Sequence, residues 1–212
     1  LLANVSAGVA AACCTYLLLF KLFEVIFNVS SVHQSGYICS MLFVIPGFPL
    51  ITGGIDLAKL DLRSGLERIT YALLIILMAT ITGWVVALLL HFSPADFPEL
   101  EMAPLLKMVI RLITSFCGVY GFSLMFNSKR KMAACAGLIG MIANTTRLEL
   151  IDFTPMPAGV AAFIGAMIAG LLASAMKSKA GYPRITLTVP SIVIMVPGMF
   201  LYKGIYYLGA YD

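Results

Sequence analysis

Residues 41–61 read MLFVIPGFPLITGGIDLAKLD, and residues 192–212 read IVIMVPGMFLYKGIYYLGAYD. The two stretches align without a gap, so that Pro46–Gly47 falls on Pro197–Gly198. The same offset places AGVAA at residues 7–11 on AGVAA at residues 158–162. Matches that recur at one long and constant spacing indicate an internal repeat. In an apolar chain, such a repeat is typical of membrane transporters.

The composition predicts that the chain lies in a lipid bilayer. Apolar residues make up 61% of its 212 residues and charged residues 11%, and the mean hydropathy is +0.99. A soluble domain carries about a quarter charged residues, which is well above the share found here. The net charge of +4 does not indicate a nucleic-acid partner, because the basic residues lie in short loops between apolar segments.

Seven apolar stretches approach the roughly 20 residues that a helix needs to cross the hydrocarbon core. They cover residues 3–23, 36–55, 69–91, 105–126, 132–148, 157–176 and 187–208. The second is interrupted by Pro46–Gly47, and the seventh by Pro190 and Pro197–Gly198. We therefore predict an all-α polytopic membrane protein with seven helices, of which two are broken at Pro–Gly.

Lysine and arginine predict how these segments are oriented. Nine of the 14 basic residues fall in loops on one side: Lys59, Arg63, Arg68, Lys129, Arg130, Lys131, Lys177, Lys179 and Arg184. The long loop HFSPADFPELEMAP on the other side, residues 91–104, contains three acidic residues and no lysine or arginine. The positive-inside rule assigns the basic side to the cytoplasm.

This orientation makes the repeat an inverted one. The first segment runs outward from the cytoplasm, and its copy, the sixth segment, runs inward. Inverted repeats related by a pseudo-two-fold axis in the membrane plane occur in secondary transporters. We therefore expect two antiparallel five-helix repeats and a ten-helix parent protein, of which this chain is a fragment. Residues 1–98 would hold the last three helices of the first repeat, and residues 99–212 the first four helices of the second.

Small residues predict that the helices pack closely. They are Gly118 and Gly121 on the fourth segment, Gly137 and Gly140 on the fifth, and Ala161, Gly165, Ala169 and Ala173 on the sixth. Lipid provides no hydrophobic driving force for helix association, so close backbone contact has to stabilise it. We interpret these residues as packing positions without a role in binding.

The two Pro–Gly breaks predict the position of a substrate site. Proline removes a backbone donor and glycine permits unusual dihedral angles. The freed backbone groups are tolerated in a membrane only where they are buried in protein or line a wet cavity. Broken helices in matching positions of both halves indicate a transporter's substrate site, and a structural kink without a ligand is the alternative. The predicted substrate-binding residues around the breaks are Pro46, Gly47, Thr52, Gly53, Pro197, Gly198 and Tyr202.

Hydroxyls and free backbone groups at these breaks suit a zwitterionic amino acid. Asp56 is the candidate proton-coupling group or ammonium partner, and a solvated residue at a helix end is the equally weighted alternative. Lys203 is interpreted as a side chain that extends to the outer interface.

A second polar set lies on the fourth and fifth segments: Ser123, Asn127, Asn144 and Arg147. Asn127 is a substrate-binding candidate, and a helix-capping role is an alternative of at least equal weight. Arg147 could bind a substrate carboxylate or anchor the helix at the lipid headgroups, and we favour the anchor.

Signatures of enzymes and metal sites are absent from the sequence. It contains no HExxH, GxSxG, Walker or CxxC pattern, and its five cysteines lie in apolar stretches without metal-ligand spacing. We therefore predict no enzymatic activity, no cofactor and no metal ion.

Several stretches resemble the bacterial threonine/serine exporter family. They are PGFPLITGGIDL, RSGLERITYALLIILMATITGW, GFSLMFNSKRKMAACAGLIGMIAN, AAFIGAMIAGLLAS and PSIVIMVPGMFLYKG. The resemblance implies ten helices in two halves and export of small hydroxy-amino acids, coupled to the proton gradient. Some two-component relatives are associated with dicarboxylate export. The positions that match the family's pattern are Pro46, Gly47, Gly53, Asp56, Asn127, Pro197, Gly198 and Tyr202.

We predict a multi-pass protein of the bacterial inner membrane that exports threonine or serine by proton antiport, with alternating access of its two repeats. Its expected partners are a small-molecule substrate, protons and the lipid bilayer, but no nucleic acid, and self-association is left open. An exporter of small dicarboxylates such as succinate is the alternative, and Arg147 or Lys203 facing the cavity would favour it. A seven-helix receptor or sensor, or a channel subunit, is the alternative from another class.

Overall fold

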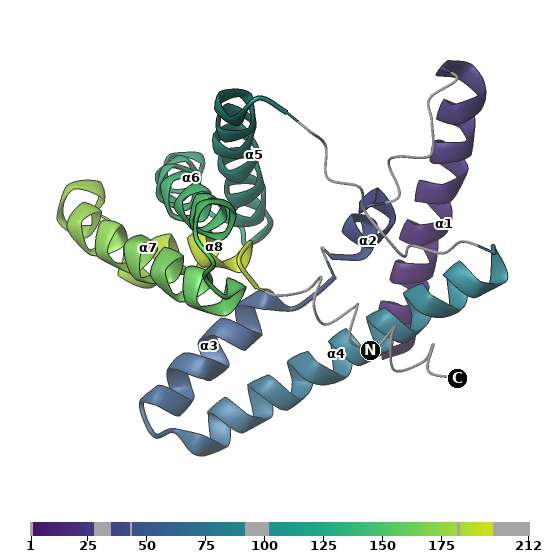
Figure 1. Ribbon diagram of the computed structural model, residues 1–212. Helices are drawn as coiled ribbons and strands as arrows, with labels where there is room; N and C mark the ends of the chain where they lie inside the picture. The colour runs from purple at the N-terminus through teal and green to yellow at the C-terminus, as the bar shows by residue number, and fades with distance from the viewer. Residues whose placement is uncertain (1, 28–34, 43, 92–101, 182, 197–212) are drawn as a thin grey trace. The chain divides into compact units, whose positions relative to one another are not determined.

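The computed structural model describes residues 2–27, 35–42, 44–91, 102–181 and 183–196. Within these ranges all regular structure is α-helical and no strand is present, as predicted. The helices are α1 (Leu2–Phe27), α2 (Ser35–Leu42), α3 (Gly47–Ala58), α4 (Leu62–Leu89), α5 (Pro104–Met125), α6 (Arg130–Phe153), α7 (Ala158–Ala180) and α8 (Arg184–Val193) (Figure 1). They belong to two units, one formed by α1–α4 and the other by α5–α8.

Among the described residues, four helices are long and apolar enough to cross a membrane. These spans are Leu2–Phe23 in α1, Leu62–Leu89, Pro104–Met125 and Ala158–Lys177 in α7. A fifth span results if α2 and α3 are counted together, with a bend of 59° between them. Large apolar side chains such as Leu77, Leu105 and Phe163 are exposed on three of these helices. Such surfaces suit lipid and would be unfavourable in water, so the chain is a multi-pass membrane protein.

Several helices differ in length from the predicted segments. α4 begins at Leu62, well before the predicted start at residue 69, because the Asp61 side chain accepts a hydrogen bond from the Ser64 amide (3.4 Å) and caps the helix. α6 likewise extends beyond the apolar segment 132–148 at both ends. The apolar pattern indicates the part of a helix that faces lipid, and polar residues continue the helix outside it. The predicted seventh segment is described as far as residue 196.

The core of the first unit joins α1, α2 and α4. Val9, Cys13 and Tyr37 are fully buried in it. The Tyr37 hydroxyl donates a hydrogen bond to the carbonyl of Gly83 on α4 (2.6 Å). A Cβ on Gly83 would lie 2.7 Å from Sδ of Met41, so a larger residue here would displace the Met41 side chain. These contacts fix α2 against α4 just before the Pro–Gly break.

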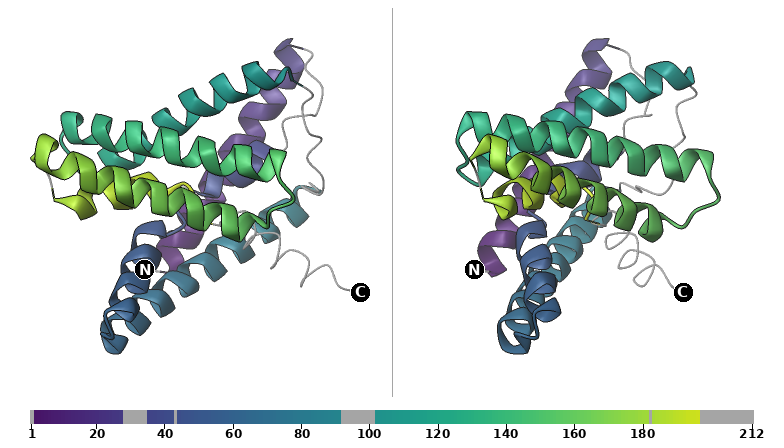
Figure 2. Two further views of the ribbon diagram at one scale, coloured as in Figure 1. Left: turned by 60° about the vertical axis from the view of Figure 1, so that its left-hand side comes forward. Right: turned by 90° about the vertical axis from the view of Figure 1, so that its left-hand side faces the viewer.

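In the second unit α6 lies between α5 and α7, and it also packs on α8 (Figure 2). The predicted packing role is confirmed for the small residues of the fifth and sixth segments, but a Cβ on Gly121 would have no neighbour within 4 Å and one on Gly118 would meet only Cγ2 of Ile194 at 3.8 Å. Ala161, Ala169 and Ala173 are fully buried, and a Cβ on Gly137 would lie 2.9 Å from the ring of Phe116 on α5. Small side chains therefore allow α5, α6 and α7 to approach closely.

A network of charged residues links α5 to α6. Lys107 Nζ lies 2.6 Å from Asp152 Oδ2, and the Arg111 guanidinium contacts both Glu149 Oε1 (3.0 Å) and Asp152 Oδ2 (2.8 Å). Asp152 lies beyond the apolar segment 132–148. The hydrogen bond from Lys107, followed by the influence of Arg111, lowers the pKa of the Asp152 carboxyl. The carboxylates of Glu149 and Asp152 thus neutralise Lys107 and Arg111, and neither carboxylate forms an ion pair with Arg147.

Candidate functional site

The predicted break in the second apolar segment is present. α2 ends at Leu42 and α3 begins at Gly47. Between them, the amides of Val44 and Ile45 each donate to the carbonyl three residues earlier (3.1 Å each). Pro46, with φ of −78° and ψ of 67°, has no amide hydrogen and cannot continue the ladder. The helix therefore restarts after Pro46 in a new direction.

The second unit contains the same turn at the matching position of the repeat. α8 ends at Val193, which corresponds to Leu42. The amides of Met195 and Val196 each donate to the carbonyl three residues earlier, at 2.9 and 3.1 Å. These amides correspond to those of Val44 and Ile45 in the first unit. Both helices thus end at one repeat position with one pattern of hydrogen bonds.

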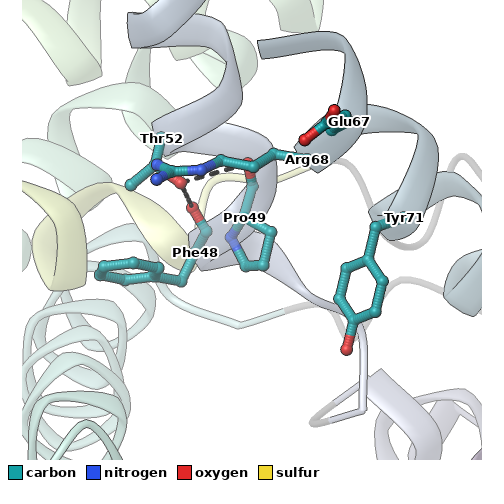
Figure 3. A pocket seen from close by; sticks show the side chains of 6 residues that line it. All are labelled: Phe48, Pro49, Thr52, Glu67, Arg68 and Tyr71. Carbon is teal, nitrogen blue, oxygen red and sulfur yellow. Dashed lines mark hydrogen bonds between the residues drawn. The ribbon is translucent and has the colours of Figure 1, made fainter. Parts of the chain in front are cut away.

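A pocket of about 380 Å³ opens between α3 and α4, which form a helical hairpin (Figures 1 and 3). Its volume lies within the range of about 300–1,000 Å³ that is usual for small-molecule sites. It is lined by Phe48, Pro49 and Thr52 from α3, and by Glu67, Arg68 and Tyr71 from α4. The α3 residues belong to the first two turns after Pro46–Gly47, so the pocket begins at the break.

Thr52 provides a buried acceptor on the α3 wall. Thr52 is 7% exposed. Its hydroxyl donates to the carbonyl of Phe48 (3.0 Å), with the Pro49 carbonyl at 3.3 Å. Because the hydroxyl hydrogen is used within the helix, the oxygen lone pairs are what Thr52 can offer to a ligand.

An ion pair joins the two walls. Arg68 extends from α4 toward α3 (Figure 3), and its Nη1 lies 3.0 Å from Asp56 Oδ2. The Asp56 side chain is 21% exposed and that of Arg68 is 51% exposed. Asp56 Oδ2 itself is buried and accepts no aligned hydrogen bond from the residues that the structure describes. The contact is therefore mainly electrostatic, and the oxygen retains the capacity to accept a hydrogen bond or a proton.

Two family models match the chain. Residues 1–91 match a threonine/serine exporter model, and residues 111–211 match the model described as Threonine/Serine exporter, ThrE. The chain belongs to the threonine/serine exporter family. The resemblance noted in the sequence is thereby confirmed over both halves, and membership favours a transporter over a receptor or sensor. The comparison with curated proteins and the comparison with solved structures each find no match.

The predicted site residues of the exporter lie in different surroundings in the structure. Pro46 and Gly47 form the break, and Thr52 lines the pocket. Gly53 faces α4 instead, where a Cβ would lie 2.9 Å from Cγ1 of Ile69 and 3.2 Å from the carbonyl oxygen of Gly65. Gly53 therefore determines how closely α3 and α4 approach. Whether these residues contact substrate stays a prediction.

Asn127 follows the end of α5, directly after Phe126. Its backbone is left-handed, with φ of 59°, and its amide donates to the carbonyl of Leu124 (2.9 Å). A left-handed asparagine directly after a helix is a common C-terminal cap. The structure therefore supports the capping alternative, and contact with substrate stays a prediction. Pro197, Gly198, Tyr202 and Lys203 lie outside the described residues.

Sequence reasoning did not assign Phe48, Glu67, Arg68 or Tyr71 to the site. The signal for Arg68 was available, because Asp56 and Arg68 flank a short turn between two helices and carry opposite charges. The aromatic residues gave no such signal, since Phe and Tyr in an apolar helix also face lipid. Within the described part of the chain, no cluster of His, Cys, Asp or Glu could hold a metal ion.

Proposed function

We propose that this protein exports threonine, serine and similar small amino acids across the bacterial inner membrane. The mechanism we propose is proton antiport with alternating access of two inverted repeats. The observation that carries the proposal is the pocket at the Pro46–Gly47 break, lined by Thr52 and Arg68, with Asp56 paired to Arg68, in a chain of the exporter family.

The polar groups of the pocket complement a small hydroxy-amino acid. The ammonium group would donate to Asp56 Oδ2, which lacks an aligned donor, and the substrate hydroxyl would donate to Thr52. Apolar walls formed by Phe48, Pro49 and Tyr71 would limit access of water and strengthen these interactions. Arg68 is the counter-ion of Asp56, and the substrate ammonium would replace it there.

Proton coupling follows from competition for one carboxylate. A proton on Asp56 removes the negative charge that an ammonium group needs, so proton and substrate exclude one another at this residue. Mutually exclusive binding at a site that alternates between two sides produces exchange, which is antiport.

The matching ends of α2 and α8 support the repeat on which alternating access depends. Both helices stop at the same repeat position and with the same two hydrogen bonds. In transporters built from inverted repeats, one repeat rocks against the other around a site at such discontinuous helices. We therefore assign both breaks to the transport pathway.

Efflux from proteoliposomes tests the proposal. The full-length protein is reconstituted, loaded with labelled threonine or serine, and assayed with and without an imposed pH gradient. We expect efflux that the gradient accelerates, and loss of that acceleration in Asp56→Asn. Asp61→Asn is the matched control, because Asp61 is an exposed N-cap of α4 and asparagine caps helices equally well. Gradient-independent efflux, or equal behaviour of the two variants, would contradict the coupling role.

An exporter of small dicarboxylates is the second candidate. The observation that favours it is Arg147, whose guanidinium has no anionic partner among the described residues, since two carboxylates require additional positive charge. Labelled succinate belongs in the same efflux assay. Efflux of succinate without efflux of threonine or serine would transfer the assignment to dicarboxylates.

A further inference from the structure

Helix α6 contains a buried asparagine whose hydrogen-bonding capacity is only half used. Asn144 is 9% exposed, and its amide nitrogen donates to Ser115 Oγ on α5 (2.9 Å). Its Oδ1 is buried and accepts no hydrogen bond from any described residue. A buried acceptor without a donor destabilises the folded state, so the site has an unused capacity for a donor.

Arg147 lies about one helical turn further on and has no partner among the described residues. Its Nε is buried without a hydrogen-bond acceptor, and no described carboxylate forms an ion pair with it. The acidic residues that follow on α6, Glu149 and Asp152, are both occupied by Arg111 at 3.0 and 2.8 Å. Arg147 is partly buried, and its Nε is the buried atom that lacks an acceptor, so an anion that binds here would supply the missing partner.

The position of Arg147 connects it with the end of α8. A Cβ on Gly165 of α7 would lie 3.2 Å from Cβ of Arg147 and 3.1 Å from Sδ of Met195. The stem of Arg147 and the side chain of Met195 therefore pack on the same small residue. Met195 belongs to the turn that ends α8 and comes directly before the second Pro–Gly pair. The unpaired cation thus lies inside the second unit, beside the turn that corresponds to the break in the first.

The anchoring role that we favoured from the sequence stays a prediction, and the structure adds one observation against it. An arginine that anchors a helix extends its guanidinium to headgroups and water. Arg147 lies instead within α6, which continues to Phe153, and its Nε is removed from solvent.

We propose that Arg147 binds a carboxylate group of the transported molecule, and that Asn144 accepts a hydrogen bond from a donor on the same molecule. This inference rests on the exporter function proposed above and adds a second binding position, within α5–α8. A guanidinium binds a carboxylate through two parallel hydrogen bonds. An amino acid and a dicarboxylate share this group. The free acceptor on Asn144 favours the amino acid, because its ammonium is a donor and ionised succinate has none.

The test compares Arg147→Gln with a matched control, Arg111→Gln, in the purified full-length protein. The readouts are the melting temperature, its increase on addition of threonine, and the KM and kcat of threonine efflux. Arg147→Gln should leave the melting temperature unchanged or raised, abolish the threonine-induced increase, and raise KM by about tenfold to a hundredfold, as expected for lost charge-assisted hydrogen bonds. Arg111→Gln should lower the melting temperature through the lost ion pairs and leave KM unchanged.

Arg147→Lys keeps the proposal testable if the glutamine variant does not fold. Lysine retains the charge but not the planar two-pronged geometry, so KM should rise with kcat little changed. Unchanged KM and an unchanged threonine-induced increase in the Arg147 variants would overturn the assignment, while efflux by the wild type would leave the exporter function standing. Wild-type protein that moves neither threonine, serine nor succinate would overturn both. If the Arg147 variants lose only succinate efflux, the carboxylate site stands and its ligand is the dicarboxylate.

Discussion

Replacing Gly140 with alanine tests how tightly α5 and α6 are packed. An ideal Cβ at this position would lie 3.1 Å from both Cβ and Cγ1 of Val119 on α5, and closer still to its Cγ2. Val119 is fully buried, and its branched side chain has one strongly preferred rotamer in a helix. The valine cannot rotate away, so the two helices must separate.

The expected change in stability is the difference between two effects. Forcing a methyl group into a packed interface is unfavourable by about 1–3 kcal/mol. Alanine in place of glycine within a helix is favourable by about 1 kcal/mol. We therefore expect Gly140→Ala to lower the free energy of unfolding by up to about 2 kcal/mol, which corresponds to a decrease of up to about 8 °C in the melting temperature of a chain of this size.

Thermal unfolding in detergent measures this change. It is followed with a thiol-reactive dye, which labels buried cysteines such as Cys13 as they become exposed. Gly121→Ala is the control, because a Cβ on Gly121 has no neighbour within 4 Å and only the helix-propensity gain remains. In Gly140→Ala/Val119→Ala the new methyl group gains space, so the double variant should be more stable than the sum of the single effects predicts. Equal melting temperatures for Gly140→Ala and Gly121→Ala would refute the close approach of α5 and α6.

Two further predictions use the same thermal assay. The pKa of Asp152 is lowered by Lys107 and then Arg111. The ionised carboxylate therefore stabilises the folded protein fully above the ordinary aspartate pKa of about 4. This stabilisation is lost as the pH falls through the lower folded-state pKa. The difference in melting temperature between wild type and Asp152→Asn should therefore shrink as the pH is lowered from neutral to strongly acidic, and a constant difference would contradict the ion-pair network. Tyr37→Phe removes the hydroxyl that donates to the Gly83 carbonyl (2.6 Å) and should destabilise the protein by about 1–3 kcal/mol, whereas an unchanged melting temperature would show that this hydrogen bond does not hold α2 on α4.

The sequence predicts the features that depend on local chemistry. The break at Pro46–Gly47 could be located because proline lacks an amide hydrogen wherever it occurs. The burial of Ala161, Ala169 and Ala173 followed from their four-residue spacing, which places them on one helix face. Both inferences need only neighbouring residues and the geometry of a single helix.

Features that depend on pairing between helices could not be predicted in the same way. The contact between Asp56 and Arg68 requires the register of the α3–α4 hairpin. The unpaired state of Arg147 depends on Arg111, which comes from another helix and occupies both nearby carboxylates. Without that contact, Glu149 would have been an equally reasonable partner for Arg147, and the arginine would have carried no inference about a ligand.

Substrate protection of a cysteine in the pocket tests the central claim most directly. Thr52→Cys is prepared in protein whose five native cysteines are replaced by alanine, and its rate of alkylation by a small maleimide is measured with and without threonine. Gly54→Cys is the control, because Gly54 is exposed on the same helix with no neighbour within 4 Å. The account predicts that saturating threonine slows alkylation at position 52 severalfold and leaves position 54 unchanged. An unchanged rate at position 52, in protein that still transports threonine, would contradict the assignment of the α3–α4 pocket as the substrate site.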